Sequence, residues 1–160
     1  MMHVQLLCVG KLKESFYVEA CREYQKRMST HCKLTIMELP EARLSDNPSP
    51  AQIEAALWKE AGTITNKLQK GAELIALCVE GKLLSSEALS KQMDHWMLTG
   101  ISSFDFIIGG SYGLHSSIKQ QASLCLSMST MTFPHHLARV MVLEQLYRSF
   151  QIRNGTRYHK

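Results

Sequence analysis

Five short apolar runs, each followed by a segment with helical periodicity, constrain the fold of this chain more than any other feature of its sequence. The runs are almost continuously apolar, which is typical of strands covered on both faces, as in parallel sheets. Strict alternation with helices predicts an α/β domain of three layers, with a mostly parallel sheet of five to six strands. The predicted strands are 4–10, 34–40, 73–80, 104–110 and 123–129, and the predicted helices lie near 13–29, 50–70, 85–99, 114–122 and 134–152.

The second predicted helix has the clearest boundaries. Ser49 is suited to the N-cap, Pro50 to the first turn, and Gln52 completes a capping box with the serine. An apolar face follows at helical spacing, and Gly71 is expected to end the helix.

Length and composition predict an ordinary globular chain. The chain has 160 residues, of which 45% are hydrophobic and 20% charged, so we expect a single domain with a core of its own. No apolar run is long enough to cross a bilayer, and the first residues do not resemble a secretory signal. We therefore expect a cytoplasmic protein without membrane association.

The five cysteines are scattered, and no two are spaced as a metal or disulfide pair. Cys8, Cys78 and Cys125 each lie in an apolar run, where a thiol acts as a small buried hydrophobe. A structural role is predicted for them, and no metal is expected.

Positive charge is concentrated in the last third of the chain. Residues 106–160 hold six Lys and Arg against a single acid, Glu144, although the net charge of the whole chain is only +4. Such a distribution favours a polyanionic partner, with phosphate contacts supplying affinity. A solvated basic surface without a partner is the alternative that charge alone leaves open.

Three strand ends are rich in small residues. They read "LCVEGK" (77–82), "IIGGSYGLH" (107–115) and "SMSTMTFPHH" (127–136). Ligands of open α/β sheets bind beyond the carboxyl ends of the strands, and glycines let a ligand approach the backbone closely. The glycine spacing matches neither the dinucleotide fingerprint nor a P-loop, so a tight turn without any ligand stays an alternative.

The last predicted helix is apolar around most of its circumference, which requires burial on several sides. Part of that burial is expected from a second subunit, and a central helix in a monomer core is the alternative. Glu144 and Arg148 are spaced for an ion pair. The tail 153–160 combines bases with aromatic rings, a composition that suits either RNA contact or a frayed end.

Taken together, these segments resemble one known family. The segments "IGGSYGLH", "LSMSTMTFPHHLARVMVLEQLYRSF", "LLCVGKLKESF", "GKLLSSEAL" and the terminal "YHK" are similar to the large-subunit ribosomal RNA methyltransferase H family of the SPOUT superfamily. The resemblance covers essentially the whole chain. It implies a single domain over 1–160, with the cofactor site and a C-terminal trefoil knot within about 73–152 and a basic tail at 153–160. A trefoil knot is a rare exception to the rule that protein chains are unknotted.

The resemblance also implies an activity. Members of this family use S-adenosylmethionine to methylate N3 of a pseudouridine in 23S rRNA, and they act as homodimers on the assembled ribosome. Gly110 and Gly113 would shape one wall of the cofactor pocket. One departure is that Cys78 stands where many relatives have an acid. The residues expected to contact the cofactor are Leu77, Gly109, Met128, Ser129, Thr130, Met131, Thr132 and Phe133.

Methylation of an imide nitrogen requires that its proton leave, so a base or a stabilising cation is expected near the target. His135, His136 and His159 are candidate bases, and Arg139 is a candidate for electrostatic assistance because a cation in so apolar a helix needs a partner. Tyr158 and His159 match the terminal motif of the family and are predicted to enter the active site, either in their own chain or in the other subunit.

Two other functions remain compatible with the sequence. One is a ribosome- or RNA-binding dimer of the same fold without catalysis, which the loss of the acid at Cys78 would favour. The other is an α/β enzyme that uses a different nucleotide, such as a flavodoxin-like domain.

Overall fold

The computed structural model describes residues 1–160, and it confirms the alternation of strands and helices. Each predicted strand and helix is present, with most boundaries moved by one or two residues. The elements are β1 (His3–Val9), α1 (Ser15–Met28), β2 (Lys33–Leu39), α2 (Pro50–Thr65), β3 (Glu73–Leu83), α3 (Ser86–Leu98), β4 (Ser103–Ile108), α4 (Ser116–Gln121), β5 (Leu124–Ser127) and α5 (His135–Arg153).

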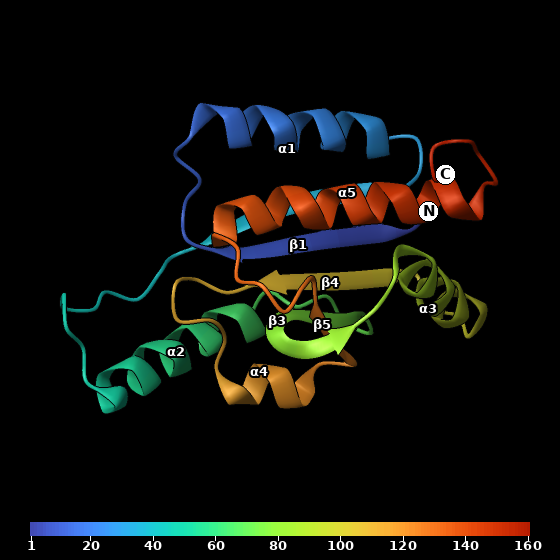
Figure 1. The fold of residues 1–160 in the computed structure, drawn as a ribbon. Coiled ribbons are helices and arrows are strands. Elements are labelled where there is room, and N and C mark those ends of the chain that lie inside the picture. Colours follow the sequence, from blue (N-terminus) through green and yellow to red (C-terminus); the bar gives the residue numbers. More distant parts are fainter.

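The five strands form one parallel sheet in the order β2-β1-β4-β3-β5. β1 pairs with β2 from His3 opposite Lys33 and with β4 from His3 opposite Ser103. Because these strands run the same way, the carboxyl ends of β1, β2 and β4 meet at one edge of the sheet, which lies on the left of Figure 1. The strand β3 starts parallel to them, but its pairing with β5 shifts register between Leu77 and Lys82, and its arrow curls back in Figure 1.

Helices cover both faces of the sheet, as the apolar runs predict. Alternate residues of β1 enter two separate cores: Leu6 and Cys8 join the core beneath α1, α3 and α5, whereas Leu7 and Val9 join the core beneath α2 and α4. Figure 1 shows α1 and α5 on one side of the sheet and α2 and α4 on the other. The result is the expected three-layer α/β fold, whereas the trefoil knot stays a prediction.

The helix α2 begins as predicted but ends early. Ser49 and Gln52 form the capping box, yet the helix stops at Thr65 rather than near residue 70. The cause is the buried carboxylate of Asp105, which accepts a hydrogen bond of 2.8 Å from the backbone N–H of Gln69 and so holds that amide outside the helix. Gly71, with φ of 75°, lies in the turn that follows.

The last helix, α5, packs against α1 on one side and α3 on the other. Its inner face is fully buried, while Val140, Met141 and Tyr147 on other faces stay partly exposed. The predicted pair of Glu144 and Arg148 is present at 2.6 Å. None of the helices has both the length and the apolar character that a membrane span requires.

Candidate functional site

A cavity of about 620 Å³ opens at the carboxyl ends of β4 and β5, beside the point where β3 becomes irregular. Its walls are residues 77–80 of β3, where the pairing with β5 shifts register, the glycine turn 108–114 that follows β4, and the loop 128–134 that leads into α5. The volume lies within the range of small-molecule sites, roughly 300 to 1,000 Å³. We call it the strand-end cavity.

The glycine turn has a backbone that only glycine permits at its first position. A side-chain carbon placed on Gly109 would lie 2.3 Å from the carbonyl oxygen of Gly113. The turn is closed by a hydrogen bond of 3.0 Å from the N–H of Gly113 to the carbonyl of Gly110, and Gly113 has φ of 80°. The close approach of these two glycines leaves one wall of the strand-end cavity formed by bare backbone.

The loop before α5 is held by hydrogen bonds that involve one serine at the end of β5 and one in the loop itself. The hydroxyl of buried Ser127 donates to the carbonyl of Ser129 at 2.9 Å, and the N–H of Met131 donates to the Ser129 hydroxyl at 3.0 Å. Met131 itself is 70% exposed at the rim. The loop is therefore ordered by local contacts and still presents an apolar side chain beside the cavity mouth.

The structure brings together nearly all the residues that the sequence predicts for the cofactor. Thr130 alone lies outside the lining of the strand-end cavity. Their contact with a bound cofactor stays a prediction. The predicted residues that line the cavity are Leu77, Gly109, Gly110, Gly113, Met128, Ser129, Met131, Thr132 and Phe133.

The cavity wall contains an acid, Glu80, although the position where many relatives have an acid is occupied by Cys78. Cys78 is buried, and burial raises the pKa of its thiol to about 12. Glu80, two residues later, lines the cavity and forms an ion pair with Lys119 of α4. The side-chain hydrogen bond from Lys119 is the main reason that the pKa of Glu80 is lowered.

The two histidines that begin α5 have different environments. His135 lines the strand-end cavity, and its Nδ1 atom is buried without a hydrogen-bond partner. Burial of the imidazole, together with neighbouring His136, lowers the pKa of His135, so its ring is neutral at pH 7. The Nδ1 atom of His136 lies 3.2 Å from the Glu14 carboxylate. Of the two rings, only that of His135 faces the cavity.

Arg139 has the partner that its position demands, but it does not line the cavity. Its side chain is completely buried, and its guanidinium donates to Oε2 of Glu38 at 2.7 Å and to the carbonyl of Gly10 at 2.8 Å. It thereby ties α5 to the ends of β1 and β2. Partial burial opposes ionisation of Glu38, yet the hydrogen bonds from Arg139 and from the Leu12 amide lower its pKa. The predicted electrostatic role of Arg139 in catalysis stays a prediction.

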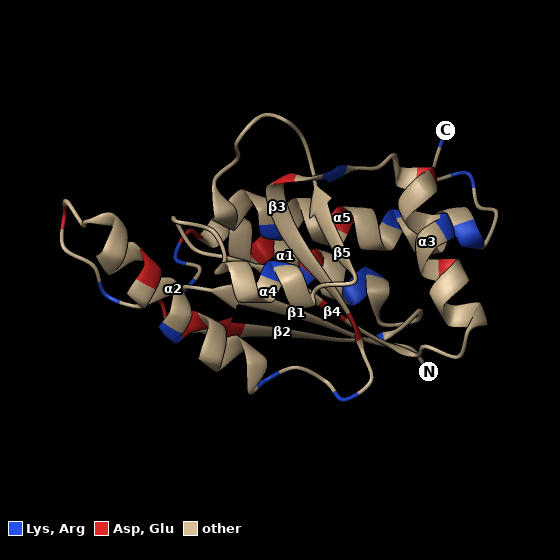
Figure 2. Cartoon of the chain, turned by 90° about the horizontal axis from the view of Figure 1, so that it is seen from below, with Lys and Arg blue, Asp and Glu red and all other residues tan.

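The C-terminal tail folds back onto its own chain rather than fraying. The hydroxyl of Tyr158 donates to Oε2 of Glu144 at 2.8 Å, and the ring of Tyr158 meets that of Tyr147 edge-on at 4.9 Å. The same Glu144 oxygen accepts a hydrogen bond of 2.6 Å from Tyr24 of α1. Figure 2 shows basic segments close to the C-terminus, in agreement with the charge asymmetry of the sequence.

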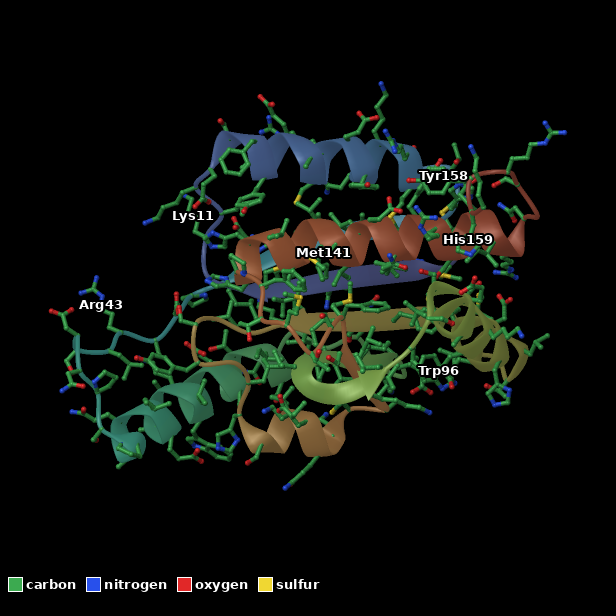
Figure 3. All side chains as sticks on the ribbon, viewed as in Figure 1. Lys11, Arg43, Trp96, Met141, Tyr158 and His159 are labelled. Carbon is green, nitrogen blue, oxygen red and sulfur yellow. The ribbon has the colours of Figure 1, made fainter.

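His159 completes this cluster at a distance from the cavity. Its Nε2 atom lies 2.6 Å from Glu87 of α3, and its Nδ1 atom lies 3.2 Å from Arg148. Figure 3 shows Tyr158 and His159 together at the end of α5 that is remote from the strand ends. Neither residue lines the strand-end cavity of its own chain.

Comparison with known proteins decides the family. A family model described as "Predicted SPOUT methyltransferase" matches residues 2–159, which is nearly the whole chain. The chain belongs to the SPOUT methyltransferase family.

Two solved structures share the fold of this SPOUT methyltransferase. A probable methylase family protein from Haemophilus influenzae Rd KW20 has a TM-score of 0.55 at 10% identity, over 98% of this chain and 70% of that one. A probable methyltransferase from Bordetella pertussis Tohama I has a TM-score of 0.58 at 15% identity, over 91% of this chain and 93% of that one. At such low identity the likeness concerns the fold alone.

Two residues near the glycine turn of this SPOUT methyltransferase have no signal in the sequence that marks them as part of the site. Glu41 places a carboxylate oxygen 3.5 Å from the N–H of Ser111, although it lies in the irregular segment between β2 and α2. Lys119 reaches the cavity rim from α4. The position of Glu80 could have been predicted, because it is two residues from Cys78 on the same strand and residues two apart on a strand share a face.

Replacing Arg139 by methionine is expected to lower the free energy of unfolding by about 2 kcal/mol, since it leaves the buried Gly10 carbonyl unpaired and removes the ion pair with Glu38, whose side chain is 39% exposed. Urea unfolding followed by circular dichroism measures the loss. Arg153→Met, on the same helix, is the matched control: its pair with Asp94 is half exposed and is worth about 1 kcal/mol at most. Equal losses in the two variants would contradict a structural role for Arg139.

Proposed function

We propose that this SPOUT methyltransferase transfers a methyl group from S-adenosylmethionine to N3 of a pseudouridine in 23S rRNA, acting in the cytoplasm as a homodimer on the assembled ribosome. The observation that carries the proposal is the strand-end cavity, which is lined by all but one of the residues that the sequence predicts to contact the cofactor. The similarity of the glycine turn, the segment around Arg139 and the terminal motif to rRNA methyltransferases supports the choice of substrate.

The residues of the cavity fit the proposed cofactor. S-adenosylmethionine carries a transferable methyl group on a positively charged sulfur, beside an adenosine and an amino acid. The bare backbone at Gly109 and Gly113 lets a flat group approach closely, while Leu77, Met128 and Phe133 supply apolar surface. Glu80 and Lys119 place one charge of each sign at the rim, where polar ends of a ligand would lie.

A second copy of the chain supplies the most direct route for the tail to reach a cavity. Within its own chain, the tail lies far along α5 from the cavity. Tyr158 contacts Glu144, which is six residues, or about 9 Å of helix rise, beyond Ala138 of the cavity wall. His159 contacts Arg148, which is ten residues, or about 15 Å, beyond Ala138. The partly exposed apolar side chains of α5, including Met141 in Figure 3, offer a surface on which another copy could pack. We therefore propose that the tail of each chain serves the cavity of its partner.

Proton removal from the imide nitrogen falls to groups at the cavity mouth in this proposal. His135 is neutral and faces the cavity, so its ring can accept a proton or hold the edge of the target base. Tyr158 and His159 of the second copy would complete the site. Arg139 would act through the position of α5, because its guanidinium is already engaged.

Calorimetry with three ligands tests the cofactor assignment. The chain is expected to bind S-adenosylmethionine, whereas ATP and FMN at the same concentrations should give no heat of binding. Uptake of FMN or ATP in preference to S-adenosylmethionine would favour an enzyme that uses another nucleotide.

The substrate is tested by mass spectrometry of 23S rRNA from a strain that lacks this protein. Loss of one methyl group from a single pseudouridine, restored by the intact gene, is the expected result. If the rRNA is unchanged although S-adenosylmethionine binds, the proposed substrate is wrong and a non-catalytic ribosome-binding role gains support.

A further inference from the structure

We propose that a hollow at the carboxyl ends of β1 and β2 binds the single-stranded RNA next to the target nucleotide. The hollow has a volume of about 480 Å³ and lies beside the strand-end cavity. We call it the Lys11 hollow. The inference rests on the proposed function, because it names the place where the substrate strand would lie. Its main side chains are those of Lys11, Lys13, Glu38, Glu41, His135 and His136.

One of the two acids that line this hollow is paired with an arginine, whereas both of its lysines are free. Glu38 is paired with Arg139, and Glu41 faces the N–H of Ser111. Lys11 and Lys13 are exposed, and neither has a carboxylate oxygen within 4.0 Å. In Figure 3 the side chain of Lys11 projects outward on the strand-end side of the molecule. Free ammonium groups beside a hollow are suited to the phosphates of a nucleic acid.

Aromatic rings lead from the surface into the hollow. Phe16 is 62% exposed, and its ring centroid lies 4.3 Å from that of Tyr17. The ring of Tyr17 lies 6.5 Å from that of His136, which in turn lies 4.2 Å from that of His135. Rings next to cations are the combination that holds single-stranded RNA, because bases stack on the rings while the cations neutralise phosphates.

The Lys11 hollow and the strand-end cavity share His135 as a common wall. A strand that lies along the aromatic rings would therefore present its next nucleotide to the cavity that we assign to the methyl donor. The ring of His135 lies at this junction, and its Nδ1 atom is buried without a partner in the protein. A neutral imidazole there can hydrogen-bond a base without opposing a positively charged cofactor.

Fluorescence anisotropy with a short uridine-rich RNA tests the inference. The double variant Lys11→Gln/Lys13→Gln should lower the slope of log affinity against log salt by about 1.4, since each lost phosphate contact on a single strand contributes about 0.7. Between 50 and 200 mM salt, the affinity of the wild-type chain would then fall about sevenfold more than that of the variant. Phe16→Ala is expected to weaken binding at least about fivefold through lost stacking.

The matched control is Lys67→Gln/Lys70→Gln, which removes the same charge from two exposed lysines at the opposite edge of the sheet, before β3. It should leave the salt slope unchanged. Three results would each overturn the inference: equal slopes for the two double variants, no RNA binding by the wild-type chain at 50 mM salt, or displacement of the RNA by polyglutamate.

Calorimetry with S-adenosylmethionine separates this inference from the proposed function. If the wild-type chain does not bind S-adenosylmethionine, the proposed function is refuted. If the lysine variant binds it as the wild-type chain does, the neighbouring cavity is intact.

Discussion

Replacing Gly109 by alanine is expected to weaken the binding of S-adenosylmethionine by more than tenfold. The added carbon would lie 2.3 Å from the carbonyl oxygen of Gly113 and 2.5 Å from its carbonyl carbon, so the backbone of the turn itself must move. Loss of two or three backbone contacts, each worth about 1 kcal/mol, reduces affinity by about 30- to 150-fold. Isothermal titration calorimetry measures the change directly.

Gly62→Ala is the matched control for this substitution. Gly62 lies within α2, no atom comes within 4 Å of an added side-chain carbon, and its φ is not positive. Alanine in a helix interior is favoured over glycine by about 1 kcal/mol, so this variant should be slightly more stable and bind the cofactor normally. Unchanged cofactor affinity in Gly109→Ala would refute the assignment of the strand-end cavity.

Removal of residues 157–160 is expected to spare cofactor binding and to eliminate methylation. The strand-end cavity contains no residue of the tail, so its affinity for S-adenosylmethionine should persist. Turnover should fall by about 100-fold or more, the contribution typical of groups that assist proton transfer. Transfer of a labelled methyl group to ribosomes from a strain lacking the protein provides the assay. If the chain without the tail keeps full activity, the tail has no part in catalysis, and its role is confined to the structural contacts with Glu144 and Glu87.

Mixed dimers determine which chain's tail serves which cavity. A tailless chain retains an intact cavity, and a Gly109→Ala chain retains an intact tail. If the tail acts in the partner's cavity, dimers that combine the two inactive chains should recover activity at one of their two sites. If the tail acts within its own chain, the mixture should stay inactive, and the proposed arrangement of the dimer would be wrong.

Local patterns were sufficient to predict the elements of the fold and most of the strand-end cavity. The apolar run that ends at Ile108 and the two glycines that follow place the turn at the end of β4, as the structure confirms. The capping box at Ser49 likewise marks the start of α2. Such signals are readable because the residues that produce them are neighbours in the sequence.

Features that depend on distant residues could not be predicted in the same way. The end of α2 is decided by Asp105, which is 36 residues from the Gln69 amide that it binds. The need of Arg139 for a partner was evident, but its partner Glu38 is 101 residues away. The contacts of Tyr158 could not be predicted either, because the composition of the tail suits RNA contact or a frayed end, whereas in the structure the tail folds back onto Glu144.

The strand order has a consequence for synthesis of the chain. β4 lies between β1 and β3, so the first three strands to be made cannot join into one sheet until residue 108 has been added. At about 5 to 20 residues per second, a nascent chain spends several seconds with the inner edges of β1 and β3 unpaired. Chaperone binding to stalled chains should therefore be strong for those that end before β4 and should decline once β4 has emerged.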